Sequence, residues 1–282
     1  MPVFDSPSPI TVVLDVASAE IRVLAGGRGE TVVEVRASNP ARAADVRLAE
    51  QASVDFSNGR LAITTPKDWK RFTFFGGTGS LDISVELPAG SHVRATTGLG
   101  GFEAEGRLGE CEVKTGLGNI RVQDTGNFSA NTGHGDIAAT VVDGTLVART
   151  GSGDIRIAVV TGNAALRNSN GAIRLGRAGG DVQAKAANGD ILMDAASDYV
   201  NAKSSNGNVR INGVTRGVIE LQTSVGEVEV GIVDGTAAWI EAASTHGRVR
   251  NTLAAGEPGE SGETAHIQAR TAYGDILIRR AS

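Results

Sequence analysis

The chain has 282 residues, of which 40% are hydrophobic and only 4% aromatic, and its formal net charge is −5. This length allows a large core, and so few aromatic residues suit a narrow core of Val, Ile, Leu and Ala. The negative charge provides no overall attraction to nucleic acid or to an anionic membrane.

No stretch approaches the ~20 apolar residues of a membrane-spanning helix, and the first residues lack the basic and apolar regions of a signal peptide. No transmembrane segment is therefore expected. We expect a cytoplasmic protein, with envelope association through a partner as the alternative.

Residues 1–92 predict β-strands, because short segments alternate or run apolar between turn signals. The expected strands are 11–16, 20–24, 30–36, 54–56, 60–64 and 81–87. This region also contains an aromatic cluster beside three basic residues, formed by Trp69, Phe72, Phe74 and Phe75. The cluster is either local core or an exposed tip that docks on a partner or a membrane surface.

From residue 93 onward a unit of about 18 residues recurs, and one glycine marks it. The marked positions are Gly100, Gly118, Gly135, Gly153, Gly171, Gly189, Gly207, Gly226, Gly247 and Gly274. The spacing is strict in the middle and loosens toward the C-terminus. Self-similarity at a short period indicates stacked units, none of which can bury its apolar face alone.

Each unit holds two short alternating segments, which is the pattern of half-buried strands. Ile155 and Ile157 belong to a first segment, and Leu146 and Ala164 share one inward position of the second. Ser-Gly or Asn-Gly pairs form the corners, and no helical stretch separates the strands. The repeat therefore predicts an all-β fold, a single-chain parallel β-solenoid of about ten rungs. Cys111 falls on an inward position and is expected to be a reduced core thiol.

Two regions are expected along the chain. Residues 1–92 form an N-terminal β cap region continuous with the solenoid, because a solenoid must protect its terminal strand edge, and residues 93–282 form the repeats. Residues 253–264, rich in Gly and Glu, predict a loop between the last two rungs. The last repeat, 265–282, is expected to end the solenoid, either as an exposed rung or against a partner.

The repeated turns T-G-x-G-[DN]-[IV] and S-N-G-[DN]-[IV], preceded by the strand region LDISVELPAG, resemble the bacterial putative-adhesin family of β-strand-repeat domains of unknown function. The resemblance covers the chain from about Ile10. It implies the fold, and for many members an envelope or envelope-stress context. No catalytic residues are established for the family, so the resemblance supplies no site.

A polar column follows the marked glycine. It consists of Asn119, Asp136, Asp154, Asp190, Asn208, Glu227 and Asp275. One interpretation is a calcium-binding β-roll, in which acidic turn residues of neighbouring rungs share ions. The other is that these side chains bond their own turn backbone. Ala172 and Arg248 interrupt the column, which favours the turn interpretation, and no metal site is assigned.

Basic residues recur at two outward positions. Lys114, Arg149, Arg167, Lys185 and Lys203 share the first, and Arg121, Arg156, Arg174, Arg210 and Arg250 share the second. Cations stacked at rung spacing could bind a polyanion or glycan. Alternatively they keep the strands soluble and pair with neighbouring acids such as Asp154. No aromatic residues interleave with them in sequence, which weighs against nucleic acid as the ligand.

Nothing in the sequence positions a nucleophile and a base, a cofactor or a metal. His134 and His246 both precede a marked glycine but lie six rungs apart, too far to share a metal. A carbohydrate-active β-helix enzyme is the catalytic alternative. Its rungs are longer and carry acidic clusters on loops, whereas these short rungs leave little room for a pocket. We therefore expect no enzyme activity and no cofactor.

The leading functional hypothesis is an adhesin-like or scaffold protein. It would act by binding another protein, or by self-association, through the surface or the ends of the solenoid. The alternative is a surface that binds a polyanion or glycan through the basic positions, and the aromatic cluster is a further candidate contact.

Overall fold

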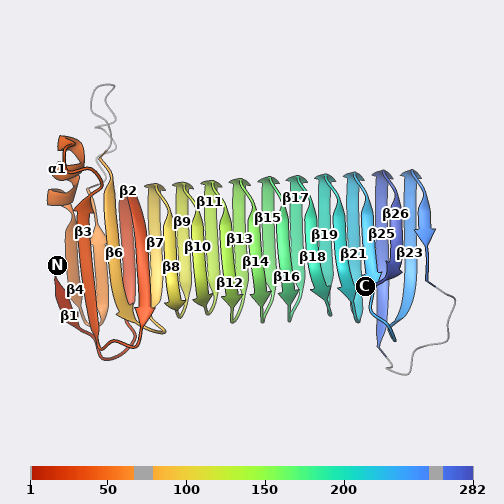
Figure 1. The fold of residues 1–282 in the computed structure, drawn as a ribbon, viewed down its shortest axis with the longest axis horizontal. Helices are drawn as coiled ribbons and strands as arrows, with labels where there is room; N and C mark the ends of the chain where they lie inside the picture. Colours follow the sequence, from red (N-terminus) through yellow and green to blue (C-terminus); the bar gives the residue numbers. More distant parts are fainter. Residues whose placement is uncertain (1, 67–78, 254–262, 282) are drawn as a thin grey trace. The chain divides into compact units, whose positions relative to one another are not determined.

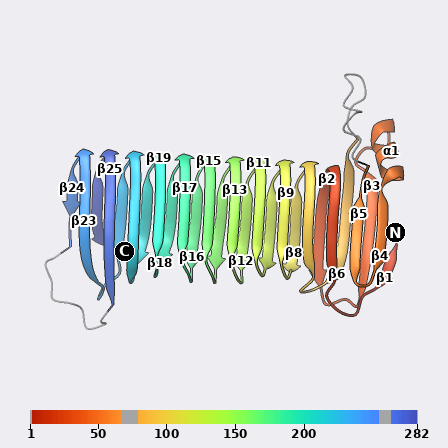
Figure 2. The same ribbon diagram turned by 180° about the vertical axis from the view of Figure 1, so that it is seen from behind.

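A computed structural model describes residues 2–66, 79–253 and 263–281 of the chain. Two compact units can be distinguished, Met1–Ala138 and Ala139–Ser282. Within each unit the strands pair mostly in parallel and in register, and successive strands alternate between two facing walls, here called wall A and wall B. This confirms the predicted all-β parallel β-solenoid. Figures 1 and 2 show the strands from the two sides.

The first unit contains one helix, α1 (Ala43–Gln51). Its strands are β1 (Val3–Asp5), β2 (Thr11–Gly26), β3 (Glu30–Ala37), β4 (Ser53–Ser57), β5 (Arg60–Thr64), β6 (Leu81–Pro88), β7 (His92–Leu99), β8 (Phe102–Arg107), β9 (Cys111–Leu117), β10 (Ile120–Thr125) and β11 (Phe128–His134). These strands confirm the segments expected in residues 11–87.

Strand β2 is long enough to form a whole rung by itself. Its first half pairs with β5 and β7 in wall B, and its second half pairs with β6 and β8 in wall A. The rung made by β5 and β6 is thus outside β2, although it follows β2 in sequence. Antiparallel β3 and β4 then cover the outer edges of β6 and β5. The expected cap thus has a structural counterpart, while the domain boundary at residue 92 stays a prediction.

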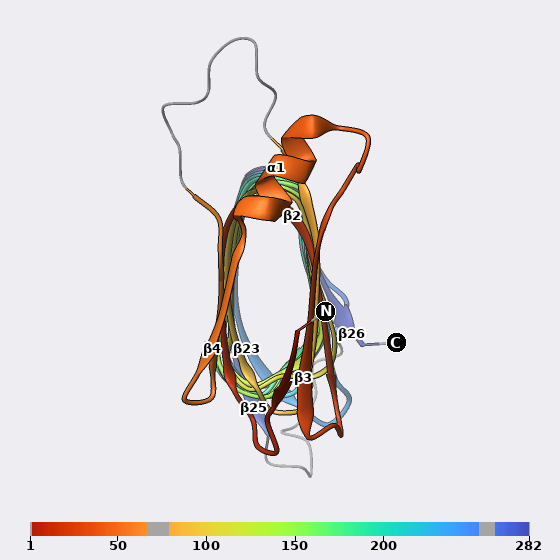
Figure 3. The same ribbon diagram turned by 90° about the vertical axis from the view of Figure 1, so that its left-hand side faces the viewer.

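Helix α1 was not expected from the sequence. Its buried Asp45 accepts hydrogen bonds from the backbone N–H groups of Asn39, at 3.1 Å, and Ser80, at 3.2 Å. The carboxylate therefore ties the helix to the chain on either side of it. Viewed from this end, α1 crosses above β3 and β4, which lie on opposite walls (Figure 3).

The strand β12 (Ile137–Val142) begins at the end of the first unit, and the remaining strands belong to the second. They are β13 (Leu146–Ser152), β14 (Ile155–Val160), β15 (Ala164–Asn170), β16 (Ile173–Ala178), β17 (Val182–Asn188), β18 (Ile191–Ala196), β19 (Val200–Asn206), β20 (Val209–Val214), β21 (Gly217–Val225), β22 (Val228–Ile232), β23 (Ala237–His246), β24 (Val249–Asn251), β25 (Thr264–Tyr273) and β26 (Ile276–Arg280). From β13 to β22, odd-numbered strands lie in wall B and even-numbered strands in wall A.

The inward columns form the core, as predicted. In wall A, Ile155, Ile173, Ile191 and Val209 are aligned in register, and each has an exposed fraction of 0%. Cys111 is likewise fully buried in the first unit, and this burial raises the pKa of its thiol. A protonated, inaccessible thiol confirms the interpretation of Cys111 as a core residue.

Two kinds of hydrogen bond recur at the corners that follow the wall B strands. A threonine or serine hydroxyl donates to the carbonyl of the marked glycine one rung earlier, as Thr223 does to Gly207 at 2.8 Å and Ser204 to Gly189 at 3.0 Å. Polar side chains after the glycine accept from the next rung, as Asp190 does from the N–H of Asn208 at 2.7 Å. These side chains stabilise the corner, but the expectation that they bond their own turn was wrong.

The order of the last rungs differs from the sequence. Strand β25 pairs with β21 on one side and β23 on the other, and β26 pairs with β22 and β24 (Figures 1 and 2). The last repeat is thus inserted between the two that precede it. The expectation that it ends the solenoid was wrong, and β23 and β24 form the outermost rung described. No helix among the described residues is long and apolar enough to span a bilayer.

Candidate binding face

Four cations lie side by side on wall B of the second unit. Arg149, Arg167, Lys185 and Lys203 occupy the same outward position of β13, β15, β17 and β19, in direct register. We call these four residues the basic row. Three of them are exposed and Lys203 is half-buried. Neighbouring strands lie ~4.8 Å apart, so the row presents one positive charge per rung in a straight line.

The basic row has no counter-charge among the described residues. None of its four members makes an ion pair or a hydrogen bond there. None of the four strands that carry them contains Asp or Glu. Their other outward positions hold small or neutral residues such as Ser169 and Ala187. The positive charge of this face is therefore available to a ligand.

The second series of basic residues behaves differently. On wall A, Asp154 pairs with Arg156 at 2.6 Å and with Arg174 at 2.9 Å, and Arg210 pairs with Glu229 at 3.3 Å. Burial alone would raise the pKa of Asp154, but the hydrogen bond from Ala172 and the two arginines together lower it. The expected pairing of basic residues with Asp154 is therefore confirmed for Arg156 and Arg174, whereas Arg149 lies on the other wall.

In the first unit the basic residues are also largely paired. Glu112 accepts from Lys114 at 2.6 Å and from Arg94 at 2.7 Å, and the hydrogen bond with Lys114 is the main reason that the pKa of Glu112 is lowered. Arg121 lies beside Glu103 in register, at a position on wall A. Arg250 lies in β24, and neither it nor Arg121 makes an ion pair with a described residue. The four residues of the basic row, on wall B of the second unit, are the consecutive in-register members of the two series that lack such a pair.

The aromatic cluster of Trp69, Phe72, Phe74 and Phe75 lies outside the described residues, so its role stays a prediction. Two other aromatic residues, which the sequence analysis did not single out, share wall B with the basic row. Tyr199 directly precedes β19 and Trp239 lies in β23, with exposed fractions of 38% and 68%. Their alignment could not be seen in the sequence, because the repeat spacing loosens here and the last repeat is inserted between their strands. Only the strand register shows that they share one column.

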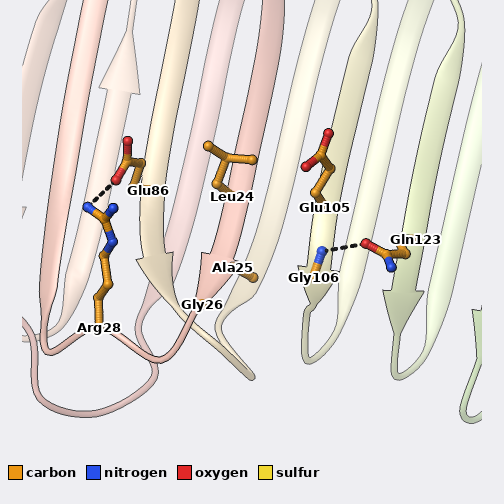
Figure 4. A pocket seen from close by; sticks show the side chains of 8 residues that line it. All are labelled: Leu24, Ala25, Gly26, Arg28, Glu86, Glu105, Gly106 and Gln123. Carbon is orange, nitrogen blue, oxygen red and sulfur yellow. Dashed lines mark hydrogen bonds and ion pairs between the residues drawn. The ribbon is translucent and has the colours of Figure 1, made fainter.

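One pocket lies in the first unit, beside the ends of β2, β6 and β8. Its volume is about 260 Å³, and Leu24, Glu86 and Glu105 line it. Figure 4 shows the ion pair of Arg28 with Glu86 on one side, and on the other the hydrogen bond from Gly106 N–H to Gln123, at 3.0 Å. Several polar groups that line the pocket therefore already bond to one another. The pocket brings together none of the predicted site residues.

The histidines do not form a metal site with their neighbours. His246 stacks on Tyr273, with ring centroids 4.7 Å apart and planes 15° apart. His92 accepts a hydrogen bond from the backbone N–H of Glu110 at 2.9 Å. Within the described ranges, no group of three or more His, Cys, Asp or Glu residues is arranged to hold a metal ion.

Among solved structures, the chain is similar to a putative lipid binding protein from Parabacteroides distasonis, at 12% identity over 98% of this chain and 95% of the other, with a TM-score of 0.48. It is also similar to a putative adhesin from Bacteroides fragilis, at 11% identity over the same shares and a TM-score of 0.37. A putative cell adhesion protein from Clostridium sporogenes matches at 12% identity over 99% and 98%, with a TM-score of 0.22. Likeness this distant carries no argument about function.

No curated protein matches the chain. A family description does, and it covers residues 11–282, which is nearly the whole sequence and includes every strand from β2 onward. The match agrees with the resemblance seen in the repeated turns and with the solenoid that those turns build. The chain belongs to the Toastrack DUF4097 family, a family of domains of unknown function.

Proposed function

We propose that this protein is a non-catalytic binding module that holds a linear polyanion on the basic row of its second unit. The observation that carries the proposal is the row itself: four in-register cations with no counter-charge among the described residues. Like charges placed side by side repel one another and destabilise a sheet. A ligand with regularly spaced negative charges would relieve that repulsion.

Binding of this kind is electrostatic, so its affinity should fall steeply as salt rises. The test is the double variant Arg149→Glu, Arg167→Glu, with inorganic polyphosphate and polygalacturonate as probes in titration calorimetry at low and high salt. We expect the double variant to bind both polymers at least about tenfold more weakly, because it reverses half of the row.

The matched control is Arg156→Glu, Arg174→Glu, which changes the net charge equally on wall A. It should leave binding within about twofold of the unchanged protein, because wall A faces away from the row. Circular dichroism melting would establish that both variants are folded. Equal weakening by the two double variants would mean that net charge, not the row, governs binding, and the proposal would be wrong.

A partner polymer of the cell envelope would make the protein envelope-associated rather than cytoplasmic. Fractionation of cells that produce the protein would decide between the two locations. A polymer inside the cell would instead agree with the location expected from the sequence.

The scaffold hypothesis is the second candidate, and the end rung supports it. Among the described residues, β23 and β24 each pair on one side only, so one edge of each strand offers unused backbone groups. The inward Ile240 is only half-buried there, which leaves apolar surface at the same end. Unpaired strand edges of this kind invite association with a second copy of the chain.

Self-association through this edge should appear as discrete oligomers in light scattering coupled to size-exclusion chromatography. The oligomers should persist at high salt, because backbone hydrogen bonds and apolar contacts form them. Ile240→Lys should return the protein to a monomer, since an inward charge on an edge strand blocks edge-to-edge pairing. A protein that is monomeric at every concentration tested would rule this candidate out.

A further inference from the structure

We propose that the polymer is an acidic polysaccharide, with Trp239 and Tyr199 as platforms on which its sugar rings stack. This inference rests on the proposed function, and it names the class of ligand. It is carried by the part of wall B that continues from the basic row across β19, β21, β25 and β23.

An apolar and aromatic column lies at the start of these four strands. Val218, His266 and Trp239 are neighbours in register on β21, β25 and β23. Tyr199 directly precedes Val200, the partner of Ile219, and so continues this column by one rung. We call these four residues the aromatic row. The side chains of Trp239, Val218 and Tyr199 have exposed fractions of 68%, 39% and 38%. So exposed a tryptophan contributes little to the core, and its large apolar ring is available to a ligand.

The aromatic row and the basic row lie on the same wall. Tyr199 and Lys203 are four residues apart along one strand direction, which corresponds to about 13 Å. Tyr199 and Trp239 are three rungs apart, or about 14 Å at the strand spacing. These separations suit a polymer of several sugar units. Some of its units would contact the cations, and others would contact the aromatic rings.

A column of carboxylate and amide groups lies one outward position further along the strands. It consists of Asn201, Glu220, Gln268 and Glu241, aligned in register. Asn201 donates to Glu220 at 2.6 Å and to the Tyr199 hydroxyl at 3.1 Å. Carboxylates and amides accept hydrogen bonds from hydroxyl groups, which every sugar ring carries.

Two polar atoms of this face make no hydrogen bond among the described residues. Asn201 Oδ1 and His266 Nε2 are shielded from solvent and make no hydrogen bond with a described residue, although His266 Nε2 lies 3.5 Å from the Glu241 carboxylate. Unsatisfied buried polar atoms are rare and cost free energy. Small rotations of these side chains would bring the atoms to a ligand that offers hydroxyl groups, so the face has unused hydrogen-bonding capacity where the sugar would lie.

The same groups weigh against a nucleic acid or a polyphosphate as the natural ligand. Glu220 and Glu241 flank the aromatic row, and they would repel a phosphate on every unit of a backbone that runs along it. A polysaccharide offers what polyphosphate lacks, because its apolar ring faces can stack on Trp239 and Tyr199 while carboxylates of other sugar units reach the basic row. Of the polymers with repeating negative charges, the acidic polysaccharide fits both rows.

The test compares polygalacturonate, which has rings and carboxylates, with inorganic polyphosphate, which has charge but no rings. Trp239→Ala should weaken binding of polygalacturonate about five- to tenfold and leave polyphosphate within about twofold. Trp239→Phe should restore most of the lost affinity, because it keeps an aromatic platform. Tyr273→Ala is the matched control: Tyr273 is 57% exposed but lies at the corner, in contact with His246, and its loss should affect neither polymer.

The outcomes separate this inference from the proposed function. If Trp239→Ala weakens both polymers equally or neither, the polysaccharide inference is overturned, while binding lost in Arg149→Glu, Arg167→Glu would still support the basic row. If the unchanged protein binds neither polymer, both proposals fail. Tighter binding of single-stranded oligothymidine than of polygalacturonate, lost in Trp239→Ala, would replace the polysaccharide with a nucleic acid.

Discussion

Replacing Gly189 by alanine is expected to destabilise the second unit by at least about 3 kcal/mol, or to prevent its folding. The backbone of Gly189 has φ +149°, which side-chain-bearing residues rarely adopt. An added Cβ would also overlap the carbonyl oxygen of Gly171 on the neighbouring rung and lie 2.6 Å from its carbonyl carbon. Both atoms belong to backbone in the middle of a stack, so neither can move without breaking the register of the strands.

Denaturant unfolding followed by circular dichroism would measure this effect. Gly213→Ala is the matched control, because its Cβ would meet its nearest atoms at 3.5 Å, an ordinary contact. We expect that variant to unfold within about 1 kcal/mol of the unchanged protein, since Gly213 lies outside the corner. Near-normal stability of Gly189→Ala would mean that the corner is not packed as described.

The sequence predicted the features of the fold that recur in every repeat, which are the inward positions and the corner. Alternation identifies inward positions within one strand, and the marked glycine identifies one corner, so each rung confirms the interpretation of the next. Cys111, Ile155 and Ile173 accordingly lie in the core, as expected. Such predictions need only local pattern, which is why they succeeded.

The order of the terminal rungs could not be predicted in this way. Ile240, Ile267 and Ile219 occupy the same inward position of three rungs, and each could pair with either of the others. A repeat specifies which side chains face inward but not which neighbour they stack on. The same holds at the other end, where β2 separates β5 from β7.

The binding face was predicted in part, and for a related reason. The sequence located the four residues of the basic row, but it could not show that Asp154 pairs with Arg174 on the next rung and leaves Arg149 without a counter-charge. Which arginine pairs with Asp154 depends on the wall that each side chain faces. Trp239 was missed because its alignment with Tyr199 passes through the inserted strand β25.

Replacing Ile267 by alanine is the sharpest test of the inserted rung. If the last repeat ended the solenoid, Ile267 would be partly exposed and its truncation would cost little. In the structure its exposed fraction is 0%, because rungs cover it on both sides. Removing three buried carbon atoms there should cost about 2–5 kcal/mol in the free energy of unfolding.

Ile240→Ala makes the same change at the equivalent position of β23, which pairs with Ile267 on one side and with no described strand on the other. Because Ile240 is only half-buried, its truncation should cost about 1 kcal/mol or less. Denaturant titrations of the two variants would give the difference directly. A larger cost at Ile240 than at Ile267 would place β23 inside the stack and β25 at its end, and the candidate self-association edge would then belong to the last repeat.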